Sequence, residues 1–176
     1  KALSRAYGIP VPAGDEAHAP DTAGPWMVKA QVPVGGRGKA GGIRRCLTPQ
    51  GAEAAAAAMK GARLKGHTVH SVLIEQAATG AERYLSLSVD PASYGVRVIY
   101  LAGGGMDVER AAEQGGAGVT CAPDRAAIAD ALSGLLTGDP DRDALMAIGR
   151  KLADLLLEKE LMLAEINPLF VSPDGA

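Results

Sequence analysis

The stretch VPVGGRGKAGGIRR, residues Val32–Arg45, contains five glycines and four cationic side chains and has no carboxylate. Acidic residues are missing over a longer span, from 22 to 52, and this span also holds Lys29. Local positive charge of this density attracts an anion. Glycines let backbone amides approach an oxyanion closely, which a merely solvated basic surface would not need. The stretch therefore predicts a phosphate-binding loop.

The loop does not match the Walker A pattern, G-x-x-x-x-G-K-[ST]. If Gly38 and Lys39 were the G-K pair, Pro33 would occupy the place of the first glycine and Ala40 the place of the hydroxyl residue. The flanking sequences also differ, because WMVKAQ and IRRCL both have the character of strands. The predicted order is strand, loop, strand, and not the strand, loop, helix of Walker and dinucleotide-binding sites.

Composition limits the classes of protein. The chain has 176 residues, 47% of them hydrophobic, with a net charge of −2, which suits one domain or two small lobes with a buried core. Aromatic residues make up only 3%, and with the negative net charge this scarcity argues against a nucleic-acid-binding module. No apolar stretch is long enough to span a membrane. The chain does not begin with Met and ends at VSPDGA, so we expect an excised or truncated domain.

The cysteines and histidines predict no metal centre. Cys46 and Cys121 are far apart in sequence and have no metal-type spacing, which predicts two free thiols in a cytoplasmic protein. His67 and His70 form H-x-x-H in a polar segment without further ligands nearby, which favours a surface loop.

The order of predicted elements points to an α+β fold. Helices are expected over 1–7, from Thr48 through the alanine-rich run to Leu64, and over 107–114, 124–136 and 143–160. Strands are expected over 25–32, 43–47, 70–77, 82–90, 96–104 and 161–171. The elements lack the regular alternation of a parallel sheet, so mostly antiparallel sheets with flanking helices are predicted.

A second group of chemistry-bearing residues lies in LAEINPLF, residues 163–170. On a strand, Leu163, Glu165 and Asn167 share one face, which places a carboxylate and a carboxamide about 7 Å apart. Hard oxygen ligands of this kind suit Mg²⁺ held against phosphates. Pro168 is expected to end the regular strand pairing directly after them. Taken alone, an edge strand with solvated polar side chains remains an alternative.

Taken together, four stretches resemble a known family: WMVKAQVPVGGRGKAGGIR, LIEQA with ERYLSLSVD, GGMDVERAAE and LAEINPL, in that order. They resemble the ATP-grasp part of the succinyl-CoA synthetase (succinate–CoA ligase) β-subunit family, which includes ADP- and GDP-forming synthetases, malate–CoA ligase and, more distantly, ATP-citrate lyase. The resemblance covers essentially the whole chain. It implies an ATP-grasp domain over 1–176, with a smaller nucleotide-lid lobe of roughly 14–76 inserted into a second lobe of 1–13 plus 77–176. It also implies truncation before the CoA-ligase domain.

The resemblance implies roles for individual residues, first at the phosphates. Lys29 matches the strand lysine that reaches the nucleotide phosphates. Gly36, Arg37 and Gly38 match the loop that closes over them. A lysine is a compact point charge, and glycine amides suit oxyanions, so both roles are chemically reasonable.

The remaining implied roles concern the base, the sugar and the metal. Glu75 matches the hinge residue whose backbone meets the adenine edge, with Ala78 at a backbone contact close by. Glu82 matches the carboxylate that accepts hydrogen bonds from the ribose hydroxyls. Asn167 matches a magnesium ligand, and Glu165 matches the acid that faces the transferred phosphate.

The function implied is that of the nucleotide-binding domain of an acid–CoA ligase, an enzyme that forms a carbon–sulfur bond. The substrate nucleotide would be ATP/ADP or a guanine nucleotide, with Mg²⁺, and the partner an α subunit carrying the phosphohistidine and the CoA site. The fragment alone is expected to be inactive, because a second magnesium ligand of the family lies on a strand beyond Ala176. Another ATP-grasp carboxylate ligase, or a non-enzymatic nucleotide-binding or nucleic-acid-binding module, remains an alternative; EINPL favours the CoA-ligase branch.

Overall fold

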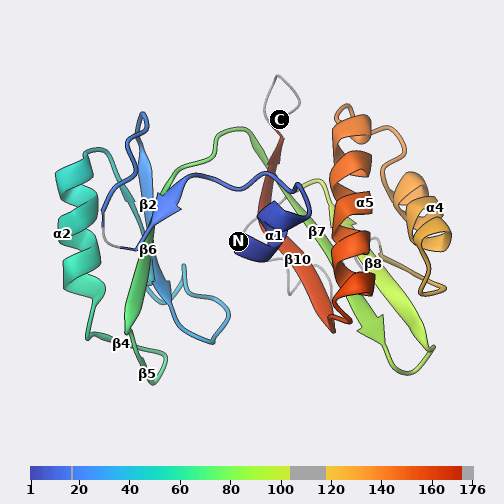
Figure 1. The fold of residues 1–176 in the computed structure, drawn as a ribbon, viewed down its shortest axis with the longest axis horizontal. Coiled ribbons are helices and arrows are strands. Elements are labelled where there is room, and N and C mark those ends of the chain that lie inside the picture. Colours follow the sequence, from blue (N-terminus) through green and yellow to red (C-terminus); the bar gives the residue numbers. More distant parts are fainter. Residues whose placement is uncertain (17, 104–117, 172–176) are drawn as a thin grey trace. The chain divides into compact units, whose positions relative to one another are not determined.

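The computed structural model describes residues 1–16, 18–103 and 118–171. The chain forms two compact units (Figure 1). We call Pro12–Ala78 the inserted unit, and Lys1–Val11 together with Thr79–Ala176 the main unit. Each unit has its own sheet and its own hydrophobic core.

The sheet of the inserted unit has four strands in the order β1-β6-β2-β3, and every neighbouring pair is antiparallel. The strands are β1 (Gly14–Asp15), β2 (Trp26–Gln31), β3 (Ile43–Cys46) and β6 (Ser71–Gln76). In the β2–β3 hairpin Trp26 pairs with Cys46 and Lys29 with Ile43. The glycine loop is the connection of this hairpin, so the predicted order of strand, loop, strand is confirmed.

Helix α2 (Pro49–Met59) covers one face of this sheet. Thr48 caps it as predicted, because its hydroxyl accepts a hydrogen bond from the Gly51 amide at 3.1 Å. The buried face of α2 is mostly alanine, and small side chains let the helix approach the sheet closely. The core contains Trp26, Val28, Ala30, Ala52, Ala55, Ala56, Met59, Leu64, Val69, Val72 and Ile74.

A two-stranded hairpin follows α2, where the sequence predicted a longer helix and a polar loop. Strands β4 (Arg63–Leu64) and β5 (His67–Thr68) pair antiparallel. The helix ends at Met59 and not at Leu64, because Gly61 follows in the left-handed region with φ +80°. The alanine-rich run therefore predicted the helix correctly but not where it ends.

The sheet of the main unit also has four strands, in the order β10-β7-β8-β9, and is antiparallel throughout. Its strands are β7 (Ala81–Asp90), β8 (Gly95–Leu101), β9 (Gly118–Cys121) and β10 (Leu163–Val171). The helices of this unit are α1 (Ala2–Ala6), α4 (Arg125–Leu135) and α5 (Arg142–Glu158). Strands β7 and β8 pair antiparallel, in agreement with the predicted antiparallel sheets. The helix predicted over 107–114 lies outside the described residues.

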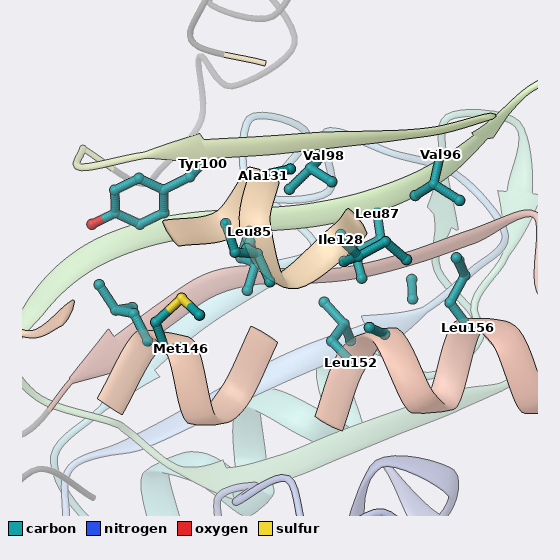
Figure 2. Close-up of a cluster of buried hydrophobic side chains, with 14 of the residues drawn as sticks. Leu85, Leu87, Val96, Val98, Tyr100, Ile128, Ala131, Met146, Leu152 and Leu156 are labelled. Atoms are coloured by element: carbon teal, nitrogen blue, oxygen red, sulfur yellow. The ribbon is translucent and has the colours of Figure 1, made fainter. Parts of the chain in front are cut away.

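Helices α4 and α5 pack on one face of this sheet and form the larger core with it. Figure 2 shows Leu85, Leu87 and Val98 of the strands facing Ile128 of α4 and Leu152 of α5. Each such side chain contributes about 1.5–3 kcal/mol when fully buried. Tyr84 and Ser86 lie on the opposite face of β7, which α4 and α5 do not cover.

A buried polar cluster connects β7 to the turn between α4 and α5. Arg83 pairs through Nη2 with Asp141 Oδ2 at 2.5 Å and with Asp139 Oδ1 at 3.5 Å. The Tyr100 hydroxyl donates a hydrogen bond to the other oxygen of Asp139. Burial opposes ionisation of Asp139, but the bonds from Tyr100 and the Asp141 amide and the charge of Arg83 together lower its pKa.

Strand β10 contains a bulge at the predicted polar site. Ile166 pairs with Leu85 and Leu169 with Arg83, so β10 has one more residue than β7 over this interval. Pairing resumes after Pro168 and runs to Val171. Pro168 therefore interrupts the pairing without ending the strand, because the bulge accommodates a residue that has no N–H to donate.

The observed architecture confirms the predicted class, a mixed α+β fold with antiparallel sheets and flanking helices. Among the residues that the structure describes, no helix has the length and apolar character needed to cross a lipid bilayer.

Candidate functional site

The predicted site residues fall into the two units. Lys29, Gly36, Arg37, Gly38, Glu75 and Ala78 belong to the inserted unit, and Glu82, Glu165 and Asn167 belong to the main unit. Each group has its own local geometry within its unit.

Lys29 and Glu75 lie together on the face of the inserted sheet that α2 does not cover. The β2–β6 register pairs Lys29 with Leu73, so Glu75, two residues further along β6, is its diagonal neighbour on the same face. The Lys29 ammonium forms an ion pair with the Glu75 carboxylate. The Glu75 side chain is 4% exposed and the Lys29 side chain 25%. The pair therefore neutralises a buried carboxylate, while a quarter of the lysine side chain stays exposed.

The electrostatic surroundings of Lys29 are unusual for a lysine. Burial lowers its pKa from the ordinary value, and the positive charge of Arg37 lowers it further. A second cation so close to Lys29 raises the local positive potential, which favours a multiply charged anion over a neutral ligand.

The glycine loop has a defined backbone conformation. Gly42 donates to the Arg37 carbonyl at 2.8 Å, Ala40 to that of Gly36 at 3.2 Å, and Gly36 has a φ of +64° that favours glycine. The Arg37 guanidinium donates to the Ala30 carbonyl at 2.9 Å, so its side chain folds back onto β2. Within the described part of the chain, the amides of Gly36, Arg37 and Gly38 donate to no backbone oxygen. Consecutive amides of this kind form a concave site for an anion.

Glu75 and Ala78 lie at the end of β6. Glu75 pairs with Met27 on one side and with Gly14 on the other. A side chain would not fit at Gly14, because its Cβ would lie 2.9 Å from Glu75 Cβ. Ala78 follows the strand and is exposed. At Glu75 the backbone of β6 therefore has a strand on each side, whereas Ala78 lies beyond the end of the strand.

In the main unit, Glu82 and Glu165 share the sheet face that α4 and α5 do not cover. Glu82, Tyr84 and Ser86 alternate along β7, and Ser86 pairs with Glu165 on β10. The Tyr84 hydroxyl donates to Glu165 Oε2 at 3.2 Å. Glu82 and Glu165 are exposed and Tyr84 is buried. The face therefore offers two carboxylates, one of them oriented by a tyrosine.

Asn167 is exposed at the bulge of β10, two residues after Glu165. No cluster of three or more His, Cys, Asp and Glu that could bind a metal occurs in the described residues. Mg²⁺ does not require one, since it is commonly held by one or two protein oxygens together with phosphates and water. The carboxylate of Glu165 and the carboxamide of Asn167 are donors that fit this ion.

Sequence reasoning missed two side chains next to these groups. Tyr84 could have been found, because alternation along β7 places it on the face of Glu82. Its contact with Glu165, however, depends on the pairing of strands 81 positions apart in the chain. Lys65 contacts the glycine loop at Gly35 from a hairpin that the sequence did not reveal.

Comparison with known proteins places this geometry in a family. The family model for the ATP-grasp domain matches residues 1–171. A succinate–CoA ligase (ADP-forming) subunit beta from Xanthomonas axonopodis pv. citri is 36% identical over 205 residues, which cover 99% of this chain and 51% of the relative. That of Thioalkalivibrio sulfidiphilus is 38% identical over 202 residues, with 99% and 52% covered. The chain thus spans about half the length of the curated relatives it matches.

Solved structures agree on the fold. The dinucleotide-forming acetyl-coenzyme A synthetase 1 of Ca. Korarchaeum cryptofilum, in complex with coenzyme A and Ca-AMPCP, matches with a TM-score of 0.64 at 19% identity and covers 96% of this chain and 83% of that one. ATP citrate lyase from Methanothrix soehngenii matches with a TM-score of 0.64 at 21% identity, covering 84% and 35%. The family match spans nearly the whole sequence, and the chain therefore belongs to the ATP-grasp domain family.

Proposed function

We propose that this chain is the nucleotide-binding domain of an acid–CoA ligase similar to the succinyl-CoA synthetase β subunit. In the whole enzyme, phosphoryl would pass between ATP/ADP, or the guanine nucleotide, and a phosphohistidine of the partner subunit, and an acyl-CoA would form. The observation that carries the proposal is the surroundings of Lys29. The lysine side chain is a quarter exposed, and the positive charge of Arg37 lies near it. The adjoining glycine loop has three consecutive amides that donate to no backbone oxygen in the described part of the chain. The curated relatives are named as ADP-forming ligases, which agrees with this chemistry.

The inserted unit would bind the phosphates and the base. Lys29 supplies a positive charge that spreads the charge of the transferred phosphoryl group, and the amides of Gly36 and Gly38 donate to phosphate oxygens. The backbone at Glu75 and Ala78 meets the adenine edge. In this proposal residues of roughly 14–76 act as the nucleotide lid, and 1–13 with 77–176 form the second lobe.

The main unit would bind the ribose and the metal. Glu82 is exposed and accepts from the ribose hydroxyls, since an ionised carboxylate is acceptor-only. Asn167 would hold Mg²⁺, which when bound neutralises phosphate charge. Glu165 faces the transferred phosphate, and the hydrogen bond from Tyr84 fixes the orientation of its carboxylate.

The partners follow from the same proposal. The α subunit would supply the phosphohistidine and the CoA site, and a CoA-ligase domain would accompany the present domain in the whole β subunit. None of His18, His67 and His70 has a place in this scheme. We place the protein in the cytoplasm, because Cys46 and Cys121 are both free thiols.

The experiment is a thermal-shift titration of the chain with magnesium-ATP, magnesium-ADP and magnesium-GTP. A ligand at a hundred times its Kd stabilises the folded state by about 2.7 kcal/mol, so the melting temperature should rise by several degrees. Lys29→Ala should abolish the rise, whereas Lys60→Ala, a charge removal at the end of α2, should retain it. Equal shifts in the wild type and Lys29→Ala would remove the assignment, and the nucleotide that gives the largest shift identifies the preferred base.

A further inference from the structure

The turn of the β4–β5 hairpin contains a lysine in a conformation that lysine rarely adopts. Lys65 and Gly66 are the two turn residues, with φ of +48° and +86°. Two-residue turns with both φ values positive strongly favour Asn, Asp or Gly at the first position, because a Cβ is strained in the left-handed region. The turn geometry alone therefore gives no reason for a lysine at this position.

The Lys65 side chain lies directly against the glycine loop. Its ammonium donates to the Gly35 carbonyl at 2.8 Å, across 30 positions of sequence. A Cβ at Gly36 would lie 2.8 Å from the same ammonium nitrogen, so the lysine end and the loop backbone are in close contact. The residue before Lys65 contacts the other end of the loop, since a Cβ at Gly42 would lie 2.5 Å from Leu64 Cδ2. The hairpin therefore touches the loop at both ends.

We propose that Lys65 is a positioning residue for the glycine loop. By holding the Gly35 carbonyl, it fixes the backbone just before the amides of Gly36, Arg37 and Gly38, which donate to no backbone oxygen in the described part of the chain. A loop with five glycines would otherwise spend much of its time in other conformations. The benefit for phosphate binding rests on the proposed function above, but the contact between Lys65 and the loop does not.

The first experiment measures loop opening without nucleotide. Trypsin cleaves after Arg37 and Lys39 only when the loop opens, and mass spectrometry follows these two sites separately from the others. Lys65→Met keeps the aliphatic stem and the same turn strain but removes the ammonium. Cleavage at these sites should become about fivefold faster, the size expected for the net contribution of one solvent-exposed hydrogen bond. Lys65→Arg should restore slow cleavage. Lys60→Met, a matched loss of charge in the same unit, should cleave like the wild type.

A second variant separates positioning from stability. Lys65→Asn places a preferred residue in the turn, so the melting temperature should stay the same or rise. Loop cleavage should nevertheless become faster, because the asparagine side chain is too short to reach Gly35. A purely structural role of Lys65 predicts the opposite pattern. Cleavage after Arg37 and Lys39 at the wild-type rate in both Lys65→Met and Lys65→Asn would overturn the proposal.

The nucleotide arm uses calorimetry with magnesium-ADP. Lys65→Met should weaken binding about five- to tenfold relative to the wild type and to Lys60→Met. If the wild type and Lys65→Met bind magnesium-ADP equally well, Lys65 does not position the loop for phosphate, and that part of the proposal is wrong. If the wild type does not bind at all, the proposed function fails, while the proteolysis still decides whether Lys65 holds the loop.

Discussion

The two units treat their charged residues in opposite ways. In the inserted unit, Lys29 and Glu75 pair on the face of the sheet that α2 does not cover, and a quarter of the lysine side chain is exposed. In the main unit, Arg83 pairs with Asp139 on the side of the helices, and both side chains are less than a tenth exposed. A partly exposed cation remains available to a ligand, whereas an enclosed one contributes only to the fold.

The overall charge of the units differs in the same direction. Residues 12–78 contain eight Lys and Arg against five Asp and Glu, a net charge of +3. Residues 1–11 and 79–176 contain ten against fifteen, a net charge of −5. A magnesium-bound nucleotide requires both signs, cations for its phosphates and oxygen donors for its metal and sugar. In the proposed function these requirements would be divided between two units whose cores are separate.

The largest effect on stability is expected at the enclosed pair of Arg83 and Asp139. Arg83→Met leaves the buried Asp139 carboxylate without its cation, which should lower the free energy of unfolding by about 3–5 kcal/mol in a urea titration. Arg97→Met is the matched control on the neighbouring strand, where the side chain is only half-buried, and should cost far less. Adding Asp139→Asn to Arg83→Met should recover part of the loss, because it removes the unpaired charge. A loss below about 1 kcal/mol for Arg83→Met would show that the cluster does not stabilise the main unit.

Local signals in the sequence were sufficient to predict most of the helices and strands. Thr48 caps its helix as predicted, and its hydroxyl accepts from the Gly51 amide at 3.1 Å. Asp124, the first residue of the helix predicted over 124–136, accepts from the Ala127 amide at 2.9 Å. Alternation along β7 places Leu85, Leu87 and Val89 on one face. Leu85 and Leu87 are buried in the core, whereas Val89 near the end of the strand is 37% exposed. These features depend on neighbours within a few residues, and the chemistry of each side chain decides them.

Two of the features that the sequence did not reveal depend on distant partners, whereas the third, the β4–β5 hairpin, is local. The β10 bulge exists only in relation to β7, and the Tyr84–Glu165 contact joins the same two strands. The β4–β5 hairpin uses a Lys-Gly turn, which lacks the usual Asn-Gly signal and follows directly on a run with strong helix propensity. The site residues came from a family resemblance, and their local composition alone could not have assigned their roles.

A smaller effect is expected at the proposed metal ligand of the main unit. Asn167→Ala should raise the magnesium concentration needed for half-maximal ADP binding about tenfold, equivalent to ~1.4 kcal/mol. Asn167→Asp keeps an oxygen donor at the bulge and should retain or strengthen the metal dependence. Circular dichroism should be unchanged in both variants, since Asn167 is exposed. An unchanged magnesium requirement in Asn167→Ala would assign the metal to other residues.

The smallest effect compares the two helix caps and tests whether the units are stabilised separately. Thr48→Ala and Asp124→Ala each remove one side-chain bond to a helix amide, which should cost about 1 kcal/mol in either unit. Because α2 and α4 belong to different cores, hydrogen exchange should become faster in α2 alone for Thr48→Ala and in α4 alone for Asp124→Ala. If either variant accelerated exchange equally in both helices, the two cores would open as one cooperative unit. The positively charged inserted unit and the negatively charged main unit would then form one folding unit. In that case the loss of a helix cap in one unit could change ligand binding in the other.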